Sequence, residues 1–161
     1  MTIKKNKYKH MKYSVEVLIE KPRDEVVKKM DNVDNMKHWQ KGLVSSEHIS
    51  GTPGKVGAKM QLNYKMGKRE MALVETITKN NFPEEFSATY HTKGMHNIQE
   101  NYFKETPEGH TKWISNCEFQ PSGFMMKAMT LLMPGAFKKQ SKKYMVDFKN
   151  FVEKGTSVAN E

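Results

Sequence analysis

Apolar and polar residues alternate along two parts of the chain. The first part is residues 12–20, where apolar side chains at every second position predict a strand with one buried face. The second part extends from residue 43 to residue 119, where short alternating stretches are separated by glycine- and proline-containing turn sequences. Strands are expected there at residues 43–50, 58–65, 70–78, 86–92, 97–105 and 111–119. Successive strands joined by short turns predict an antiparallel meander, which gives a sheet of seven strands when the first strand is included.

Helical patterns lie on both sides of this strand-rich region. Pro22 stands where a first helical turn tolerates proline, and residues 21–39 predict two short helices that turn Met36 and Trp39 inward. After residue 123, apolar residues recur with a period close to 3.6 for about 30 residues. The apolar side would consist of Met126, Met129, Met133, Phe137, Tyr144, Phe148 and Phe151. The one interruption, at Pro134 and the following glycine, predicts a kink or a break in this long helix.

The order of these elements predicts a single α+β domain over residues 12–154. The long amphipathic helix would cover the concave face of a curved antiparallel sheet, and the two short helices would close one end. Such an arrangement leaves a cavity between the sheet and the helix, which is a suitable place for a ligand. Residues 1–11 would form a basic arm, and residues 155–161 would form a mobile tail after a glycine helix stop.

Two segments carry a resemblance to a known group of proteins. The segment VEVLIEKPRDEVVKKMDNVDNMKHWQKGL combines the first strand, Pro22, the pair of short helices and Trp39. The segment GHTKWISNCEFQPSGFMMKAM runs from the last strand through a proline into the C-terminal helix. Over residues 12–154 the chain resembles the START-like, Bet v 1-like helix-grip superfamily (SRPBCC), which includes polyketide cyclases, aromatases and lipid-transfer proteins.

The resemblance implies a hydrophobic cavity that binds or transfers a hydrophobic small molecule, such as a lipid, a polyketide-like compound or an aromatic compound. The alternative that it implies is an enzyme of the cyclase or aromatase type, which acts on such a ligand in the same cavity. Buried tyrosine and tryptophan side chains need hydrogen-bond partners, so several of them around one cavity suit a ligand with one polar end. The candidate ligand-binding residues are Trp39, Tyr64, Tyr90, Glu100, Tyr102, Trp113, Phe119, Met126, Met129 and Met133. Ordinary core packing is the alternative interpretation of these side chains.

Two carboxylates are candidates for the interior. In the strand at residues 70–78 either set of alternate residues can face inward, and one of the two sets includes Glu75. Glu100 lies between Ile98 and Tyr102 on the face of its strand that the pattern assigns to the interior. There its pKa would be raised, and it would serve as an acid, a base or an anchor. In the alternative orientation Glu100 faces water.

The remaining motifs do not combine into a catalytic or metal centre. His91 and His96 would face one another across a tight hairpin, but two imidazoles lack the third ligand that a zinc site needs. The sequence GTPGKVG at residues 51–57 lacks the spacing of a phosphate-binding loop. Cys117 has no base that the sequence places beside it. We therefore predict neither a metal nor a cofactor.

Composition narrows the class of protein further. The 161 residues include 27 Lys and Arg against 18 Asp and Glu, which gives a formal net charge of +9, and one cysteine. Because no secretory signal pattern is present and the methionine-rich stretch is too short for a membrane span, a cytoplasmic location is predicted. Nearly all positive residues are lysines, which predicts a solvated surface and no specific nucleic-acid binding. Weak contact of the lysine clusters with an anionic membrane surface is a further alternative, and the oligomeric state has no signal in the sequence.

Overall fold

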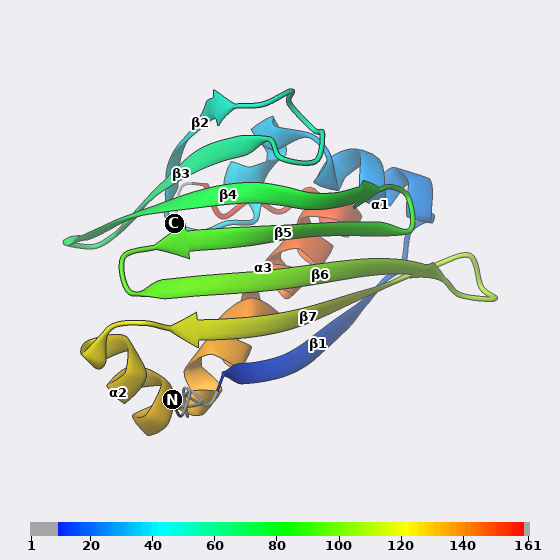
Figure 1. Ribbon diagram of the computed structural model, residues 1–161. Coiled ribbons are helices and arrows are strands. Elements are labelled where there is room, and N and C mark those ends of the chain that lie inside the picture. Colours follow the sequence, from blue (N-terminus) through cyan, green and yellow to red (C-terminus); the bar gives the residue numbers. More distant parts are fainter. Residues whose placement is uncertain (1–9, 160–161) are drawn as a thin grey trace, which may run out of the picture.

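The computed structural model describes residues 10–159, so most of the predicted basic arm and the end of the predicted tail lie outside the described residues. The described chain forms one antiparallel sheet of seven strands, three α-helices and one 3-10 helix (Figure 1). The strands are β1 (Met11–Ile19), β2 (Leu43–Ser50), β3 (Lys59–Met66), β4 (Arg69–Asn81), β5 (Glu85–Thr92), β6 (Met95–Glu105) and β7 (Thr111–Pro121). Their spatial order is β1-β7-β6-β5-β4-β3-β2, which confirms the predicted meander with the first strand added beside the last.

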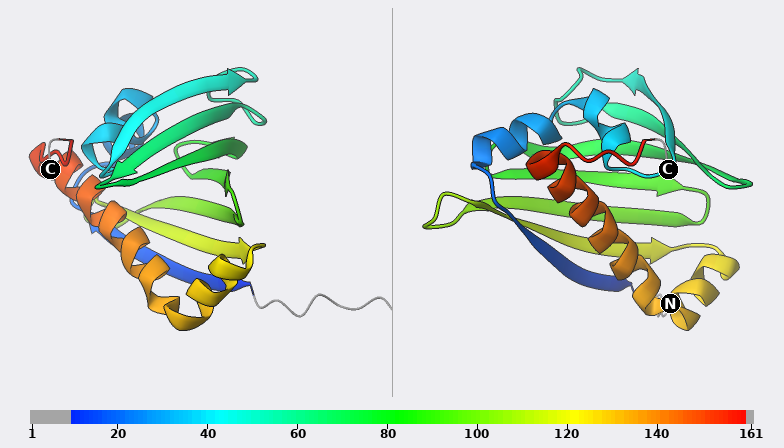
Figure 2. Two further views of the ribbon diagram at one scale, coloured as in Figure 1. Left: turned by 90° about the vertical axis from the view of Figure 1, so that its left-hand side faces the viewer. Right: turned by 180° about the vertical axis from the view of Figure 1, so that it is seen from behind.

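The helices lie on the concave face of the sheet and at its ends. The helix α1 (Arg23–Met30) and the 3-10 helix η1 (Val33–His38) follow β1, where two short helices were predicted. The long helix α3 (Pro134–Lys154) runs diagonally across the concave face, as Figure 2 shows from two sides. The helix α2 (Phe124–Leu132) lies at the end of the sheet, next to the turn between β5 and β6.

The predicted interruption of the C-terminal helix is a complete break. Met133 has φ −132° and ψ 57°, and it separates the end of α2 from Pro134 in the first turn of α3. Proline has no N–H to donate into a preceding turn, and it disfavours the helical conformation of the residue before it. The chain therefore changes direction at Met133, so that α2 does not extend α3.

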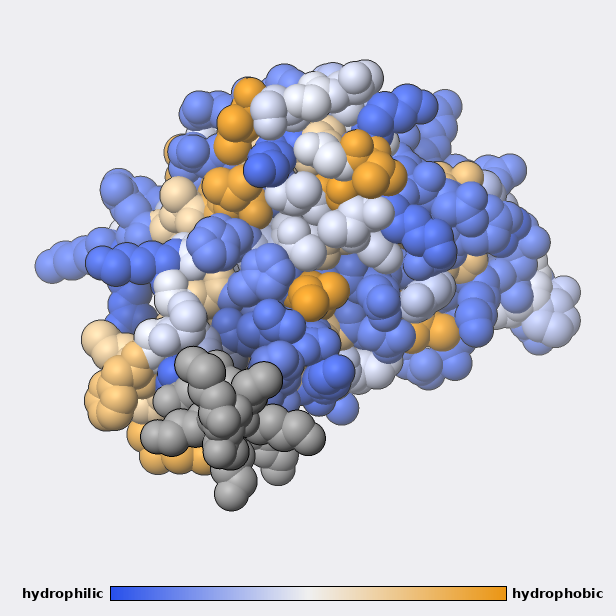
Figure 3. Space-filling model, in the orientation of Figure 1, coloured by the Kyte–Doolittle hydropathy of each residue, from blue (hydrophilic) through white to orange (hydrophobic). Residues whose placement is uncertain are grey.

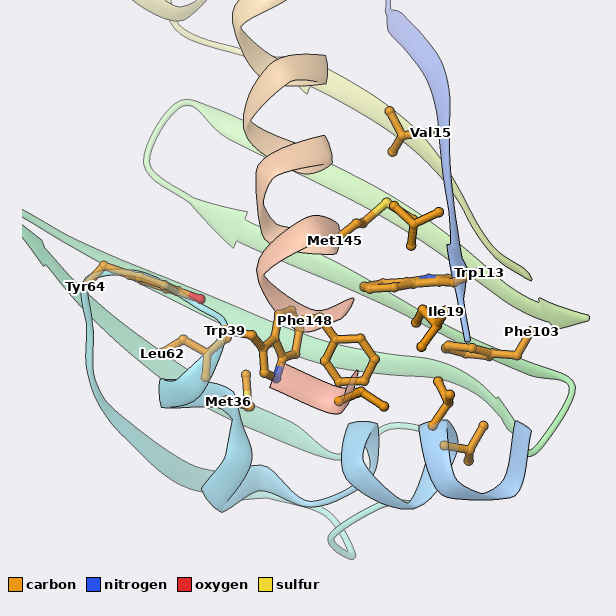
Figure 4. Close-up of a cluster of buried hydrophobic side chains, with 14 residues drawn as sticks. Val15, Ile19, Met36, Trp39, Leu62, Tyr64, Phe103, Trp113, Met145 and Phe148 are labelled. Atoms are coloured by element: carbon orange, nitrogen blue, oxygen red, sulfur yellow. The ribbon is translucent and has the colours of Figure 1, made fainter. Parts of the chain in front are cut away.

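The hydrophobic core lies where α3 crosses β1, β7 and the short helices (Figure 4). Phe148 is fully buried, and its ring packs edge-on against Trp39 and Trp113 at centroid distances of 5.2 and 5.3 Å. Trp113 in turn stacks on Phe103 at 5.9 Å. The other buried members of the cluster are Val15, Val17, Ile19, Val26, Val27, Met36, Leu62, Tyr64, Met145 and Val152. These contacts fix the position of α3 above the sheet.

Lysine side chains of α3 bind the backbone of β1, the edge strand next to β7. The ammonium group of Lys142 donates a hydrogen bond to the carbonyl oxygen of Glu16. The ammonium group of Lys149 donates to the carbonyl oxygen of Leu18 at 2.7 Å and forms an ion pair with Glu153 at 2.7 Å. Part of the lysine surplus of the chain therefore has a structural role along this edge.

The segment after α3 is held against η1. Gly155 ends α3 in the left-handed conformation (φ 70°), as expected of a glycine helix stop. The N–H of Val158 donates to the carbonyl oxygen of His38 at 3.1 Å, and the His38 ring lies within 2.8 Å of the Ser157 hydroxyl. Val158 is buried. Residues 157 and 158 thus contact η1, and the mobility of the tail from residue 155 onward stays a prediction.

Candidate functional site

The inward face of β4 carries a buried carboxyl group. Of the two alternatives that the sequence left open, the structure turns Leu73, Glu75 and Ile77 inward, and Glu75 is 9% exposed. In the register of the sheet, Glu75 pairs with Met60 of β3 and with Tyr90 of β5. The carboxyl group therefore lies on the concave face, between the side chains of two neighbouring strands.

Burial determines the protonation of the groups around Glu75. Desolvation raises the pKa of Glu75, and a hydrogen bond with the Tyr90 phenol partly offsets this rise. Burial also raises the pKa of Tyr90 well above its ordinary value, and the charge of Glu75 adds to the effect. The pKa of Tyr64 is raised by burial first, and then by the charges of Tyr144 and Glu75. In this poorly solvated space a protonated Glu75 both donates and accepts hydrogen bonds.

Replacing Glu75 by glutamine is expected to reduce the pH dependence of stability. The pKa of the Glu75 carboxyl group is higher in the folded state than in the unfolded state, where it is near 4.5. Proton binding by this group therefore stabilises the fold fully at pH values below 4.5, and this stabilisation is lost as the pH rises through the pKa of the folded state. The Glu75→Gln variant should therefore melt several degrees above the unaltered protein near neutral pH, since each kcal/mol corresponds to about 2–4 °C in a chain of this size. Thermal unfolding between acidic and neutral pH measures the difference. If the two proteins, and the exposed control Glu47→Gln, give parallel curves, Glu75 is not buried in solution.

The strands beyond β5 add amide side chains to the same face. On β6, Asn97 and Asn101 are buried, and Gln99 between them is half-buried. Gln99 donates to Asn97 at 2.8 Å, and the indole N–H of Trp113 donates to Asn101 at 3.0 Å. Hydrogen bonds of this kind hold the amides in fixed orientations next to apolar walls.

Water reaches part of this face although α3 covers it. Tyr90 lies on β5, in the interior of the sheet, and its side chain points to the concave side, yet it is only half-buried. Met60, Leu73 and Tyr144 are likewise half-buried. A side chain between a sheet and a helix keeps accessible surface only where the packing beside it is open. The four side chains near Glu75 therefore keep part of their surface exposed on the concave side of the sheet.

Half of the predicted ligand-binding residues lie on the concave side, as expected. They are Trp39, Tyr64, Tyr90, Trp113 and Phe119. The Tyr64 hydroxyl, which reaches from β3 toward α3 in Figure 4, donates to the side chain of Gln40. The ring of Phe119 is half-buried and packs against Phe137 of α3 at 4.8 Å. That these side chains contact a ligand stays a prediction.

Glu100 and Tyr102 lie on the opposite face of β6, so their predicted inward orientation is wrong. Glu100 is exposed and borders an open groove on the outer face together with Ile98 and Asn116. The inward face was assigned by hydrophobicity, but on β6 the inward positions include three amides and the outward positions include an isoleucine and a tyrosine. A shift of one residue reverses the face of every side chain in a strand. The carboxyl group of the interior is that of Glu75.

The three predicted methionines lie on α2 and at its end. Met126 is half-buried against the turn between β5 and β6, where its Cγ would be 3.4 Å from a Cβ atom on Gly94. Met129 is 41% exposed and Met133 is 58% exposed. Because the chain breaks before Pro134, these side chains are carried to the end of the sheet.

A second polar cluster joins β1, β7 and α3 on the concave side. The Tyr13 hydroxyl lies 2.7 Å from the Ser141 hydroxyl and donates to the carbonyl oxygen of Phe137 at 3.1 Å. Cys117 is buried nearby, and burial raises the pKa of its thiol. A thiol that stays protonated is a poor nucleophile, so this cluster gives no support to nucleophilic catalysis.

His91 and His96 face one another across the hairpin of β5 and β6, as predicted, with ring centroids 5.9 Å apart. Together with His10 and Lys127 they border a surface recess of about 450 Å³. Within residues 10–159, no group of three or more His, Cys, Asp or Glu is arranged to hold a metal ion.

Solved structures with the same arrangement of strands and helices place this chain in a known fold. The structure of Ara h 8.0201, a Bet v 1 allergen, matches with a TM-score of 0.71 over 89% of this chain and 98% of that chain, at 11% identity. The chain has the Bet v 1-like helix-grip fold. Two bacterial proteins extend the helix-grip comparison: TTHA0849 from Thermus thermophilus (TM-score 0.72, 9% identity, 91% and 99% covered) and SA2116, of unknown function, from Staphylococcus aureus (TM-score 0.67, 14% identity, 89% and 96% covered).

The helix-grip likeness is one of structure alone. The sequence matches no protein-family model and no curated protein. A fold shared at such low identity does not determine an activity, because unrelated functions occur on the same fold. The function of this helix-grip protein must therefore be inferred from the chemistry of its own side chains.

Proposed function

We propose that this helix-grip protein binds a hydrophobic small molecule between the sheet and α3, with Glu75 and Tyr90 orienting its polar end. The observation that carries the proposal is the buried carboxyl group of Glu75, which lies beside the half-buried Tyr90 on the concave face of the sheet. Met60 and Leu73 provide apolar surface beside this pair. Burial of the Glu75 carboxyl group costs stability, because desolvation outweighs the effect of Tyr90, and a role in holding a ligand accounts for its position here.

The chemistry of this wall favours a ligand with a large apolar body and one hydroxyl or carbonyl group. Burial of the apolar body drives binding, at about 25 cal/mol per Å² before the costs of ordering the ligand. A protonated Glu75 can donate to a carbonyl oxygen or accept from a hydroxyl group. An ionised ligand would meet a like charge when Glu75 is ionised, so neutral lipids, polyketide-like compounds and aromatic compounds fit better than anions.

Native mass spectrometry of the freshly purified protein tests this proposal. We expect a non-covalent adduct that is lost on denaturation, and its mass limits the identity of the ligand. A neutral apolar dye should bind the stripped protein at a single saturable site and should be displaced by the extracted compound. Preparations that are always free of adduct, together with the absence of a saturable dye site, would refute the proposal.

A second function, acid–base catalysis of the cyclase or aromatase type, is favoured by one observation, the raised pKa of Glu75. A carboxyl group whose pKa is moved toward neutrality is a better general acid or base under physiological conditions. With the compound identified by mass as substrate, Glu75→Gln should abolish turnover and leave dye binding nearly unchanged. Equal turnover by the variant and the unaltered protein would exclude catalysis by Glu75 and leave the binding function in place.

A further inference from the structure

The helix α2 turns its apolar side chains outward. The exposed apolar residues of α2 and its C-cap are Phe124, Met125, Met129, Leu131, Leu132 and Met133. Phe124 is 88% exposed and Leu131 is 82% exposed. Because successive residues of a helix are about 100° apart, the exposed side chains of α2 itself form one continuous arc. Figure 3 shows the hydrophobic surface that results at the lower left of the molecule, whereas a surface helix of a globular protein usually exposes its polar side.

The opposite side of α2 carries Met126, Lys127 and Thr130, which are half-buried and face the rest of the protein. Lys127 borders the recess that also contains His91 and His96. The hydroxyl of Thr130 donates to the carbonyl oxygen of Lys127 at 2.9 Å. No residue of α2 is buried, so the apolar arc contributes nothing to the core. An exposed apolar surface of this kind on an ordered element marks a site of interaction.

The surroundings of α2 are positively charged. Between Glu118 and Asp147 the sequence contains no aspartate or glutamate. The lysines in this stretch are Lys127, Lys138, Lys139, Lys142 and Lys143. Lys138 and Lys139 are exposed at the start of α3, directly after the break at the end of α2. An apolar arc bordered by cations complements a surface in which anionic headgroups lie above acyl chains.

We propose that α2 docks this protein on the surface of an anionic phospholipid bilayer. Phe124, Leu131 and Leu132 would enter the boundary between headgroups and acyl chains, and Lys138 and Lys139 would face the lipid phosphates. Among the described helices none is long and apolar enough to cross a membrane, so α2, with 9 residues, would lie in the plane of the surface. The docking surface is separate from the ligand site under α3 and does not depend on it.

Co-sedimentation with lipid vesicles tests the apolar part of the proposal. Vesicles of phosphatidylcholine with about one-third phosphatidylglycerol should bind the protein, and pure phosphatidylcholine vesicles should bind it much less. The variant Phe124→Ser/Leu131→Ser should bind the anionic vesicles about tenfold more weakly or worse. The control Val44→Ser/Val56→Ser removes two exposed apolar side chains at 67% and 66% exposure elsewhere on the surface, and it should bind like the unaltered protein.

A second pair of variants tests the charge complementarity. Lys138→Glu/Lys139→Glu should weaken binding and reduce its dependence on salt, whereas Lys55→Glu/Lys68→Glu, with the same change in net charge, should have a smaller effect. Equal losses in these two variants would overturn the proposal, because net charge alone would then explain binding. Equal binding by Phe124→Ser/Leu131→Ser and the unaltered protein would overturn it as well. The proposal would also be overturned if sedimentation velocity showed a dimer of the unaltered protein that Phe124→Ser/Leu131→Ser abolishes, because a second copy of the chain would then cover the apolar arc.

Discussion

Replacing Phe148 by alanine is expected to lower the free energy of unfolding by about 3–5 kcal/mol. Phe148 of α3 is fully buried, and its ring contacts Trp39 and Trp113 at centroid distances of 5.2 and 5.3 Å. The two indoles belong to different elements and cannot both close the space left by the ring, so the variant keeps a cavity in addition to losing apolar burial. The midpoint of thermal unfolding should fall by roughly 6–20 °C in a chain of this size.

The matched control is the same substitution on the surface. Phe124 is 88% exposed on α2, and Phe124→Ala should change the free energy of unfolding by no more than about 0.5 kcal/mol. Urea unfolding of the two variants and the unaltered protein gives both the free energy and its slope with denaturant. Similar losses in both variants would mean that α2 is packed against the protein in solution, contrary to its exposure here.

Replacing Gln99 by tryptophan is expected to lower the affinity for an apolar dye by at least about tenfold. Gln99 points to the concave side of β6, where it is half-buried, and it lies opposite the fully buried Ala88 of β5. An indole at this position would lie beside Tyr90, where we propose that the ligand binds. A fluorescence titration measures the affinity, and a thermal unfolding curve shows whether the variant is folded.

The neighbouring residue provides the control for this substitution. Ile98 points to the outer face of the same strand, so Ile98→Trp adds the same side chain without entering the ligand space, and dye binding should be unchanged. Gln99→Ala removes the amide without filling the space, and it should also keep the dye. If all three variants bind the dye equally well, the guest does not lie between the sheet and α3.

Strand alternation predicted most of the fold because one side of each strand packs on a helix or on the short connecting segments. On β1 the inward residues Val15 and Val17 alternate with exposed polar residues, so the sequence predicted both the strand and the face of it that is buried. On β7 the buried residues Trp113 and Cys117 alternate with half-buried residues, most of which are polar. The number and antiparallel direction of the strands followed from the turn sequences between these alternating runs.

The alternation of apolar and polar residues did not predict the inward face of a strand where buried polar side chains have partners on another strand. Asn101 is buried with the indole of Trp113 donating to it, and Glu75 lies inward beside Tyr90 of the neighbouring strand. Such pairings depend on the register of the sheet, which hydropathy does not encode. For this reason Glu100 was assigned to the interior, and Glu75 remained one of two alternatives.

The C-terminal region shows a different limit. Pro134 made an interruption predictable, but the direction of α2, which precedes the break, depends on contacts with the turn at Gly94. The position of the last described residues likewise depends on a hydrogen bond between Val158 and His38, which are far apart in the sequence. Contacts between residues that are far apart in the chain leave no periodic pattern in a single sequence.

The lysine side chains that bind the backbone of β1 affect how the protein behaves toward other chains. A free edge strand is a template for strand addition, whether by a peptide or by another copy on the way to a fibril. At β1 the carbonyl oxygens of Glu16 and Leu18 already accept hydrogen bonds from Lys142 and Lys149. An incoming strand would have to displace two ammonium groups and leave their charges beside it. Lysine, which supplies most of the positive charge of the chain, thus also opposes β-sheet aggregation at this edge.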